Sequence, residues 1–246
     1  MELRFFKHLE FKNPSMVAAW PGMGYLAKTS VDFLRRQLKA EPFAEILQYQ
    51  NAVIYKDGVV DLPIVRHRFY SNVKGDVVLC IGDGQPRIPE EAYRIASMVI
   101  DVAERCNVKR VYTLAAFPDD FYEAPRVFGI ATSEDLSVSL EEHGIEMAED
   151  EGVVNGLNGL LIGLAKTRGI EGICLLGQIR YVNVPQIRSS KAVLDALIGL
   201  LDFKIDTTRL ELRAEKIEER IKSKIERHQK KIKKEEKDIK KLNYIS

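Results

Sequence analysis

Two glycine-rich turns are the segments of this chain whose residue types could bind a phosphate or another small polar ligand. The first, residues 21–24 (PGMG), follows an apolar run and precedes a helical pattern. Gly22 and Gly24 permit positive φ angles and let a backbone or a phosphate approach the N-terminus of a helix. A dinucleotide site would also need a ribose-binding carboxylate at the end of a second strand. Glu41 and Glu45 flank a proline instead, so a tight strand-to-helix turn is the simpler interpretation.

The second turn, residues 81–87 (IGDGQPR), also follows an apolar run. Asp83, Gln85 and Arg87 carry polar groups that could converge on a ligand close to the first turn. A small-molecule-binding enzyme with a nucleotide or phosphate ligand would use the cleft between the two turns. An ordinary turn is the simpler interpretation of the same residues.

The rest of the chain shows no pattern typical of catalysis or of metal binding. The four histidines lack metal-ligand spacing, and no serine lies in a nucleophile elbow. Cys80, Cys106 and Cys174 are far apart and mostly surrounded by apolar residues, which indicates reduced thiols in a core. We therefore expect no metal site, and a catalytic group only if residues distant in sequence converge.

Short apolar runs alternate with helical patterns, which predicts a layered α/β domain that positions the two turns. The predicted strands cover residues 16–20, 52–55, 77–81, 110–115, 127–131 and 173–176. The predicted helices cover residues 25–38, 89–105, 134–142, 157–168 and 189–201. Asp57-Gly58 lies between two β-branched runs and is a hairpin signal, so part of the sheet should be antiparallel.

A long charged helix with one narrow apolar stripe is predicted at the end of the chain. Residues 208–242 contain no glycine or proline, and Thr208 with Glu211 fits a capping box at the helix start. The stripe residues recur at steps of three, four or seven and are Ile217, Ile221, Ile225, Ile232, Ile239 and Leu242. Such a stripe predicts packing against a neighbouring subunit, with a solvated extension as the alternative.

Charge divides the chain at about the same place. Residues 204–246 hold 15 Lys and Arg against 9 Asp and Glu, a net charge of +6, whereas residues 1–203 have a net charge of −5. We expect one domain over 1–203 and a basic helix and tail over 204–246. An acidic protein surface, including that of another subunit, is the expected partner of the tail. The apolar stripe lacks Trp and Phe, so a membrane is excluded, and nucleic acid is unlikely.

The start of the chain is charged, and no apolar run is long enough to span a membrane. These features differ from a signal peptide and from a membrane anchor. The sequence therefore predicts a cytoplasmic protein.

Several short motifs occur in a fixed order. They are the PGMG and GDGQP turns, residues 125–132 (PRVFGIAT), and residues 156–161 (GLNGLL) followed by 169–171 (GIE) and 175–177 (LLG). In order and spacing they resemble the PAC2 family of proteasome assembly chaperone homologues, including its archaeal members, over about residues 10–212. The resemblance implies a three-layer α/β/α domain with a mixed, nucleoside-phosphorylase-like sheet. It also implies no required cofactor and a function carried out by surface contact with other proteins.

The chain departs from the family pattern in one core turn. Where family members often have Leu-Leu-Gly-Glu-Thr, this chain has Gln178 and Ile179 after LLG. The change removes a carboxylate from the edge of the sheet at which α/β proteins bind ligands. This departure favours a protein that keeps the fold and works through its surface.

The last residues resemble the hydrophobic-Tyr-any tail with which proteasome activators insert between α-ring subunits. Tyr244, Ile245 and Ser246 end the chain, with the tyrosine one place earlier than in that tail. The sequence as a whole predicts a non-enzymatic, proteasome assembly chaperone-like protein that self-oligomerises. Its leading partners are proteasome α-subunits or the core particle. The alternatives are the small-molecule enzyme described above and a structural scaffold for another protein, such as a small protein partner.

Overall fold

The computed structural model describes residues 1–119, 121, 124–148, 151–217 and 219. The chain divides into two compact units, Met1–Ile205 and Asp206–Ser246. Among the described residues, no helix is both long and apolar enough to cross a membrane.

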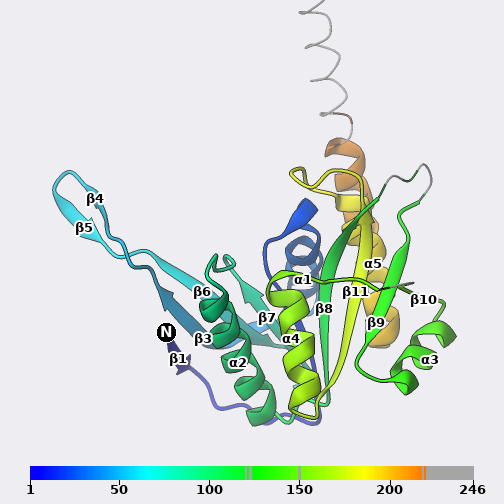
Figure 1. Ribbon diagram of the computed structural model, residues 1–246, viewed down its shortest axis with the longest axis horizontal. Helices are drawn as coiled ribbons and strands as arrows, with labels where there is room; N and C mark the ends of the chain where they lie inside the picture. Colours follow the sequence, from blue (N-terminus) through cyan, green and yellow to red (C-terminus); the bar gives the residue numbers. More distant parts are fainter. Residues whose placement is uncertain (120, 122–123, 149–150, 218, 220–246) are drawn as a thin grey trace, which may run out of the picture. The chain divides into compact units, whose positions relative to one another are not determined.

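A nine-stranded mixed sheet is the central layer of the first unit (Figure 1). The strands lie in the order β1-β3-β6-β7-β2-β8-β11-β9-β10. Their bounds are β1 Glu2–Phe5, β2 Ser15–Ala19, β3 Glu41–Tyr49, β6 Ile64–Ser71, β7 Val77–Gly82, β8 Arg110–Pro118, β9 Val127–Ala131, β10 Glu146–Met147 and β11 Glu171–Ile179. Strands β7, β2, β8 and β11 are mutually parallel, whereas β1, β3, β6 and β7 pair antiparallel in turn.

Helices cover both faces of this sheet. On one face α2 (Pro89–Arg105) packs against α4 (Gly156–Thr167), and on the other α1 (Leu26–Gln37) packs against α5 (Ile187–Leu200) (Figure 1). The short helix α3 (Glu134–Glu142) lies beside β9 and β10, and a single 3-10 turn, Met23–Tyr25, precedes α1. The predicted α/β/α arrangement with a mixed sheet is confirmed.

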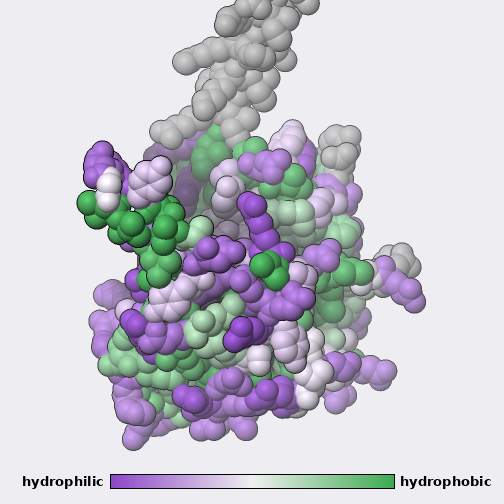
Figure 2. Space-filling view, turned by 60° about the vertical axis from the view of Figure 1, so that its left-hand side comes forward, coloured by the Kyte–Doolittle hydropathy of each residue, from purple (hydrophilic) through white to green (hydrophobic). Residues whose placement is uncertain are grey.

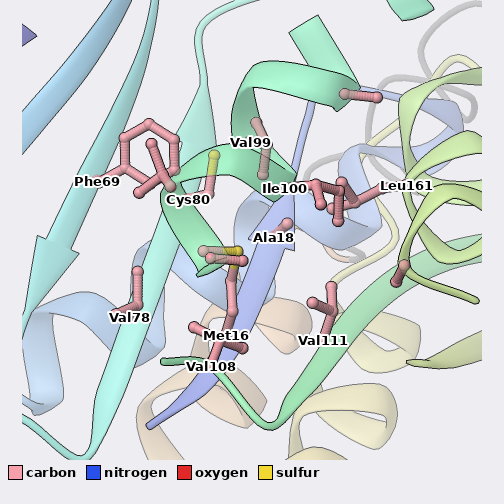
Figure 3. Packing of buried hydrophobic residues seen from close by; sticks show 14 of the residues in the cluster. Met16, Ala18, Phe69, Val78, Cys80, Val99, Ile100, Val108, Val111 and Leu161 are labelled. Carbon is pink, nitrogen blue, oxygen red and sulfur yellow. The ribbon is translucent and has the colours of Figure 1, made fainter. Parts of the chain in front are cut away.

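The core lies between the parallel strands and the helix pairs. In the layer under α2 and α4, Met16 and Ala18 of β2 face Val99 and Ile100 of α2 and Leu161 of α4 (Figure 3). All six residues of β7 are buried, as expected for a strand covered by helices on both sides. The continuous apolar runs that predicted β2, β7 and β8 reflect this double burial.

Strand β3 contradicts the interpretation of the residues around Pro42. Glu41 and Glu45 belong to this strand, and a register shift between Pro42 and Ala44 accommodates the proline. The buried Glu45 accepts hydrogen bonds from Arg66 of the neighbouring strand at 2.9 and 3.0 Å. The polar residues of β3 therefore obscure its strand pattern in the sequence, although the Glu45 charge is paired within the sheet.

The Asp57-Gly58 hairpin forms as predicted but stands apart from the main sheet. Strands β4 (Ile54–Lys56) and β5 (Val59–Asp61) make a separate two-stranded sheet. Asp57 and Gly58 have φ angles of 50° and 80°, the signature of a type I′ turn. The antiparallel pairs of the main sheet come from other strands.

The helix of the second unit begins at residue 208, where the sequence places it. The group at its start is the Asp206 carboxylate, which accepts bonds from the Thr208 amide at 2.9 Å and from the Thr208 hydroxyl at 2.5 Å. Thr208, the predicted capping residue, is thus itself bonded through both its amide and its hydroxyl to Asp206. Ile217 belongs to the described part of this helix, whereas the other predicted stripe residues lie outside the described residues.

A buried polar pair joins two strands beneath the glycine-rich turns. The Trp20 indole N–H donates to Nδ1 of His67 over 2.9 Å, and both residues have no exposed surface. Gly82 faces this pair, and a Cβ there would lie 2.7 Å from His67 Nδ1 and closer still to the indole ring. Gly82 is therefore required for close approach. Burial lowers the pKa of His67 to about 4, an effect opposed by the charge of Asp83.

The His67 environment predicts a loss of stability in acid. Unfolding returns the pKa of His67 from about 4 to about 6.5, so below pH 6.5 the unfolded chain binds a proton that the folded chain does not. The stabilisation that comes from neutral His67 should be fully present above pH 6.5. The free energy of unfolding should be lower by about 3 kcal/mol at pH 4 because of this residue. His67→Gln should flatten this loss. Urea unfolding at several pH values, followed by circular dichroism and by the fluorescence of Trp20, the single tryptophan, measures it. Equal acid losses in both proteins would contradict the assignment.

Candidate functional site at the carboxyl edge of the sheet

The two glycine-rich turns lie side by side because they follow neighbouring parallel strands. Residues 20–25 follow β2 and residues 83–88 follow β7, which pair in parallel register from Ser15 and Val77 to Ala19 and Ile81. This is the edge of the sheet at which open α/β folds bind ligands. The expected juxtaposition of the two turns is therefore present.

Gln85 closes the space between the turns. Its Nε2 donates to the Pro21 carbonyl oxygen over 2.7 Å, and its Oε1 accepts the Leu157 backbone N–H over 3.0 Å. That N–H belongs to the first turn of α4, where a helix would offer its free amides to an anion. Gly156 has a φ of 78°, and a Cβ on it would lie 2.6 Å from Gln85 Oε1. The amide of Gln85 thus occupies the position that a phosphate oxygen would need.

Gly24 packs against the loop between β11 and α5. Its N–H donates to the Val182 carbonyl oxygen over 2.7 Å, and its own carbonyl accepts the Gln186 N–H over 2.9 Å. Gly24 has a φ of 61°, and a Cβ there would lie 2.8 Å from Gln186 Cγ. The positive φ and the close contact with Gln186 explain why a glycine is needed at position 24 without any bound ligand. Gly22 faces Gln85 Nε2 at a distance of 3.7 Å from its virtual Cβ.

The charged residues of the second turn point to different partners. Asp83 pairs with Arg68 of β6 at 3.3 Å and approaches Lys28 of α1 at 4.0 Å. Arg68 in turn lies 3.9 Å from Glu45, so Asp83 ends a row of alternating charges across the sheet. Arg87 is exposed. Asp83, Gln85 and Arg87 are therefore not brought together around one point.

Gln178 is a bridging residue whose role the sequence does not reveal. Its Nε2 donates to Asp119 Oδ2 over 2.9 Å, and its Oε1 accepts the Arg126 N–H over 2.9 Å. A carboxylate at this position would face the Asp119 carboxylate without a proton to share. Gln178 replaces the glutamate that the family pattern led us to expect. The substitution therefore gives a neutral side chain that ties down the loop after β8.

The thiols and the possible metal ligands of the described residues are placed as follows. In the described part of the chain, no group of three or more His, Cys, Asp or Glu side chains is placed to hold a metal ion. Burial raises the pKa of the Cys106 thiol to about 12 and that of Cys174 to about 11, and it also raises that of Cys80. A hollow of about 230 Å³ lies between Phe5, Phe43 and Arg105, at the opposite edge of the sheet from the glycine-rich turns.

Two further sets of residues were predicted to contact protein partners, the end of the chain and the isoleucine stripe. Tyr244, Ile245 and Ser246 lie outside the described residues, as does most of the isoleucine stripe.

Solved structures with the same fold come from archaea and bacteria. PbaB of Pyrococcus furiosus, described as an archaeal proteasome activator, has a TM-score of 0.79 and 26% identity, covering 90% of this chain and 97% of that one. PbaA of the same organism, described as an archaeal homolog of proteasome-assembly chaperone, has a TM-score of 0.76 and 23% identity, with 98% of each chain covered. A PAC2 family protein from Streptomyces avermitilis has a TM-score of 0.68 and 23% identity, with coverage of 85% and 95%.

A sequence relative supports the same grouping. An uncharacterized protein of Methanocaldococcus jannaschii is 28% identical over 209 residues, which cover 83% of this chain and 80% of the relative. The sequence model of the PAC2 family matches residues 16–225, a span that includes the whole sheet from β2 onward and both glycine-rich turns. The chain therefore belongs to the PAC2 family.

Proposed function

We propose that this PAC2 family member is a non-enzymatic, proteasome assembly chaperone-like protein of the cytoplasm. In this proposal it self-assembles and binds protein partners through its surface and its C-terminal tail. It consumes no substrate, and its partners are proteasome α-subunits or the core particle.

The observation that carries the proposal is the closed carboxyl edge of the sheet. The Leu157 N–H is bonded to Gln85 Oε1 and the Gly24 N–H to the Val182 carbonyl oxygen, so two amides that an α/β enzyme would present to an anionic ligand already have partners. Buried polar groups that already have good partners gain little from an incoming anion, which would first have to displace them. Contact with other molecules is then left to the outer surface.

The partner is inferred from a relative. PbaB, at 26% identity over 90% of this chain, is described as an archaeal proteasome activator. The C-terminal Tyr244, Ile245 and Ser246 offer an aromatic ring and a free carboxylate, which suit a pocket containing a lysine. Lysines along residues 237–241 would speed the encounter without fixing its specificity.

Self-assembly is inferred from the isoleucine stripe of the second unit. Ile217, Ile221, Ile225, Ile232 and Ile239 follow one another along an otherwise charged segment. Each isoleucine buried against a neighbour would contribute about 1.5–3 kcal/mol. Several of them together would offset the cost of association.

The closed turns predict that nucleotides, nucleosides and phosphate do not bind there. Millimolar ATP, adenosine or phosphate should therefore leave the midpoint temperature of thermal unfolding unchanged. Binding would be detectable, because a ligand at 100 times its Kd would stabilise the fold by about 2.7 kcal/mol. Differential scanning fluorimetry with sodium chloride at matched ionic strength provides the control. A saturable rise in the midpoint with any of the three compounds, lost in Gln85→Ala, would revive the enzyme alternative.

The isoleucine stripe predicts which tail residues hold the oligomer together. The double variant Ile225→Ser with Ile232→Ser should weaken self-association at least tenfold, because it removes two side chains that the proposed contact would bury. The matched control is Lys224→Ser with Lys231→Ser, one residue earlier in each case. Sedimentation equilibrium of the full-length chains measures the difference. Equal association of the two variants would favour a solvated tail.

The terminal tyrosine predicts a proteasome contact that is separable from self-assembly. Tyr244→Ala should reduce co-purification with proteasome α-subunits several-fold at low salt while the oligomer mass stays unchanged. Asn243→Ala, its neighbour in sequence, should behave like the unsubstituted protein. If the full-length protein binds neither the α-subunits nor the assembled core, the proposal of a proteasome partner is wrong. A scaffold for another protein would then be the better proposal.

A further inference from the structure

A β-hairpin arm, residues 50–63, projects from the carboxyl edge of the sheet. The backbone bond from Gln50 N–H to the Pro63 carbonyl oxygen, 3.2 Å, closes its base between β3 and β6. Beyond this bond β4 and β5 pair only with each other. Figure 1 shows the arm extending away from the main sheet. A link between adjacent antiparallel strands needs only two to five residues, so the arm is far longer than the connection requires.

The two faces of the arm differ in polarity. Tyr55 pairs directly with Val60, and directly paired residues lie on the same face of a two-stranded sheet. Alternation continues this face to Val53 and Leu62, so all four of its residues are apolar. We call this set the apolar face of the arm. The opposite face mixes Ile54, Lys56, Val59 and Asp61.

The apolar face has no cover within the described chain. Tyr55 and Val60 are 76% and 63% exposed, and Val53 and Leu62 are exposed as well. Apolar side chains gather along the projecting arm in the surface view (Figure 2). Together they present a few hundred Å² of apolar surface, the size that marks interaction sites on soluble proteins. An isolated two-stranded sheet is also only marginally stable in water, so a covering partner would stabilise the arm.

A second exposed apolar cluster lies on the same edge of the body. It consists of Met23, Tyr25, Tyr181 and Val182, which we call the rim patch; each is more than two-fifths exposed. The bonds of Gly24 to residues 182 and 186 hold the two loops of the patch together. Tyr25 has a φ of 52°, a left-handed conformation that costs a bulky residue about 1 kcal/mol or more. The fold therefore keeps Tyr25 exposed in spite of an unfavourable backbone conformation.

We propose that the apolar face of the arm docks on the rim patch of a second copy of this chain. The inference rests on the self-assembly proposed above and names a contact for it outside the C-terminal helix. The arm projects away from its own body, so its apolar face is available to another molecule.

Charge complementarity supports a second copy as the occupant. The arm carries Asp57 and Asp61 against Lys56, whereas residues 180–188 contain Arg180 and Arg188 and no acidic residue. The turn that carries Met23 and Tyr25 has no charged residue to oppose burial. An acidic arm and a basic rim therefore attract each other across a largely apolar contact.

The contact area sets the expected strength and symmetry. Each patch is smaller than the roughly 800 Å² per partner of a standard interface, so the arm adds to a larger assembly. Because the arm and the rim patch are different surfaces of one chain, two copies can exchange arms about a twofold axis, or successive copies can link head-to-tail.

Two double variants that differ only in the face they alter test the proposal. Tyr55→Ser with Val60→Ser removes the apolar face, and Ile54→Ser with Val59→Ser removes similarly exposed residues, 61% and 72%, from the opposite face. In full-length chains, sedimentation equilibrium should show self-association weakened about tenfold by the first change and little altered by the second. All four sites are exposed, so both variants should fold and give the far-ultraviolet circular dichroism spectrum of the parent.

Cross-linking tests the direct contact. Chains carrying Tyr55→Cys and differently tagged chains carrying Tyr181→Cys are co-expressed and treated with a short bis-maleimide, and the mixed dimer should form. Cys80, Cys106 and Cys174 are buried, so they should react little. Val73→Cys, at a 98% exposed site beyond β6 on the opposite edge, replaces Tyr55→Cys in the control and should give no mixed dimer.

The outcomes separate this inference from the proposed function. If the parent oligomerises and neither double variant differs from it, or if no mixed dimer forms, the arm contact is wrong while self-assembly stands. If the parent is monomeric at all concentrations, both are wrong. If the Tyr55 and Val60 variant keeps its oligomer mass but loses proteasome α-subunits, the arm binds another protein, and the proposal of a second copy is overturned.

Discussion

Glutamine side chains satisfy the backbone groups at the carboxyl edge of the sheet, and the loops there depend on this arrangement. Gln85 joins the turn after β2 to the first turn of α4, and Gln178 joins the two ends of the loop between β8 and β9. A carboxamide donates and accepts at once, whereas a carboxylate only accepts. Each of these side chains bridges a donor to an acceptor, so each can fix two segments without a counter-ion. The edge that usually recruits a ligand is thereby completed from within.

The sequence predicts best those elements whose apolar residues follow a clear pattern. Strands β2, β7, β8, β9 and β11 and helices α1 to α5 form close to the predicted residues, because their apolar patterns have no competing signal. Strand β3 was missed because Pro42 and two glutamates interrupt its pattern, and β6 because Arg66, His67 and Arg68 occupy its centre. Those charges are paired across strands, as in Glu45 with Arg66. Such pairing depends on how two strands align with each other, and a short stretch of sequence does not contain that information.

The candidate site was predictable only in outline. The glycine turns and their shared edge follow from strand order, because parallel neighbours end at the same edge. The partners of the polar residues do not. Asp83 faces Arg68 and Lys28, which come from β6 and α1, and Gln85 reaches a backbone amide 72 positions later in the chain. Nothing in a glutamine's neighbours in sequence distinguishes a bridge from an exposed side chain. The hairpin shows the converse, because Asp57-Gly58 fixes the turn but does not determine whether its strands join the main sheet.

A closed edge and an exposed arm are two consequences of one topology. The parallel strands bring the loops after β2 and β11 together, and the bonds at Gly24 fix them there. Fixed loops present side chains such as Tyr25 and Tyr181 in defined positions, which lowers the entropy lost when a partner covers them. The arm leaves the same edge because β3 runs parallel to β7 through its antiparallel pairing with β6. A fold that fills its ligand edge with its own amides therefore gains a rigid surface beside a projecting apolar one. In the proposed function, that edge serves protein recognition.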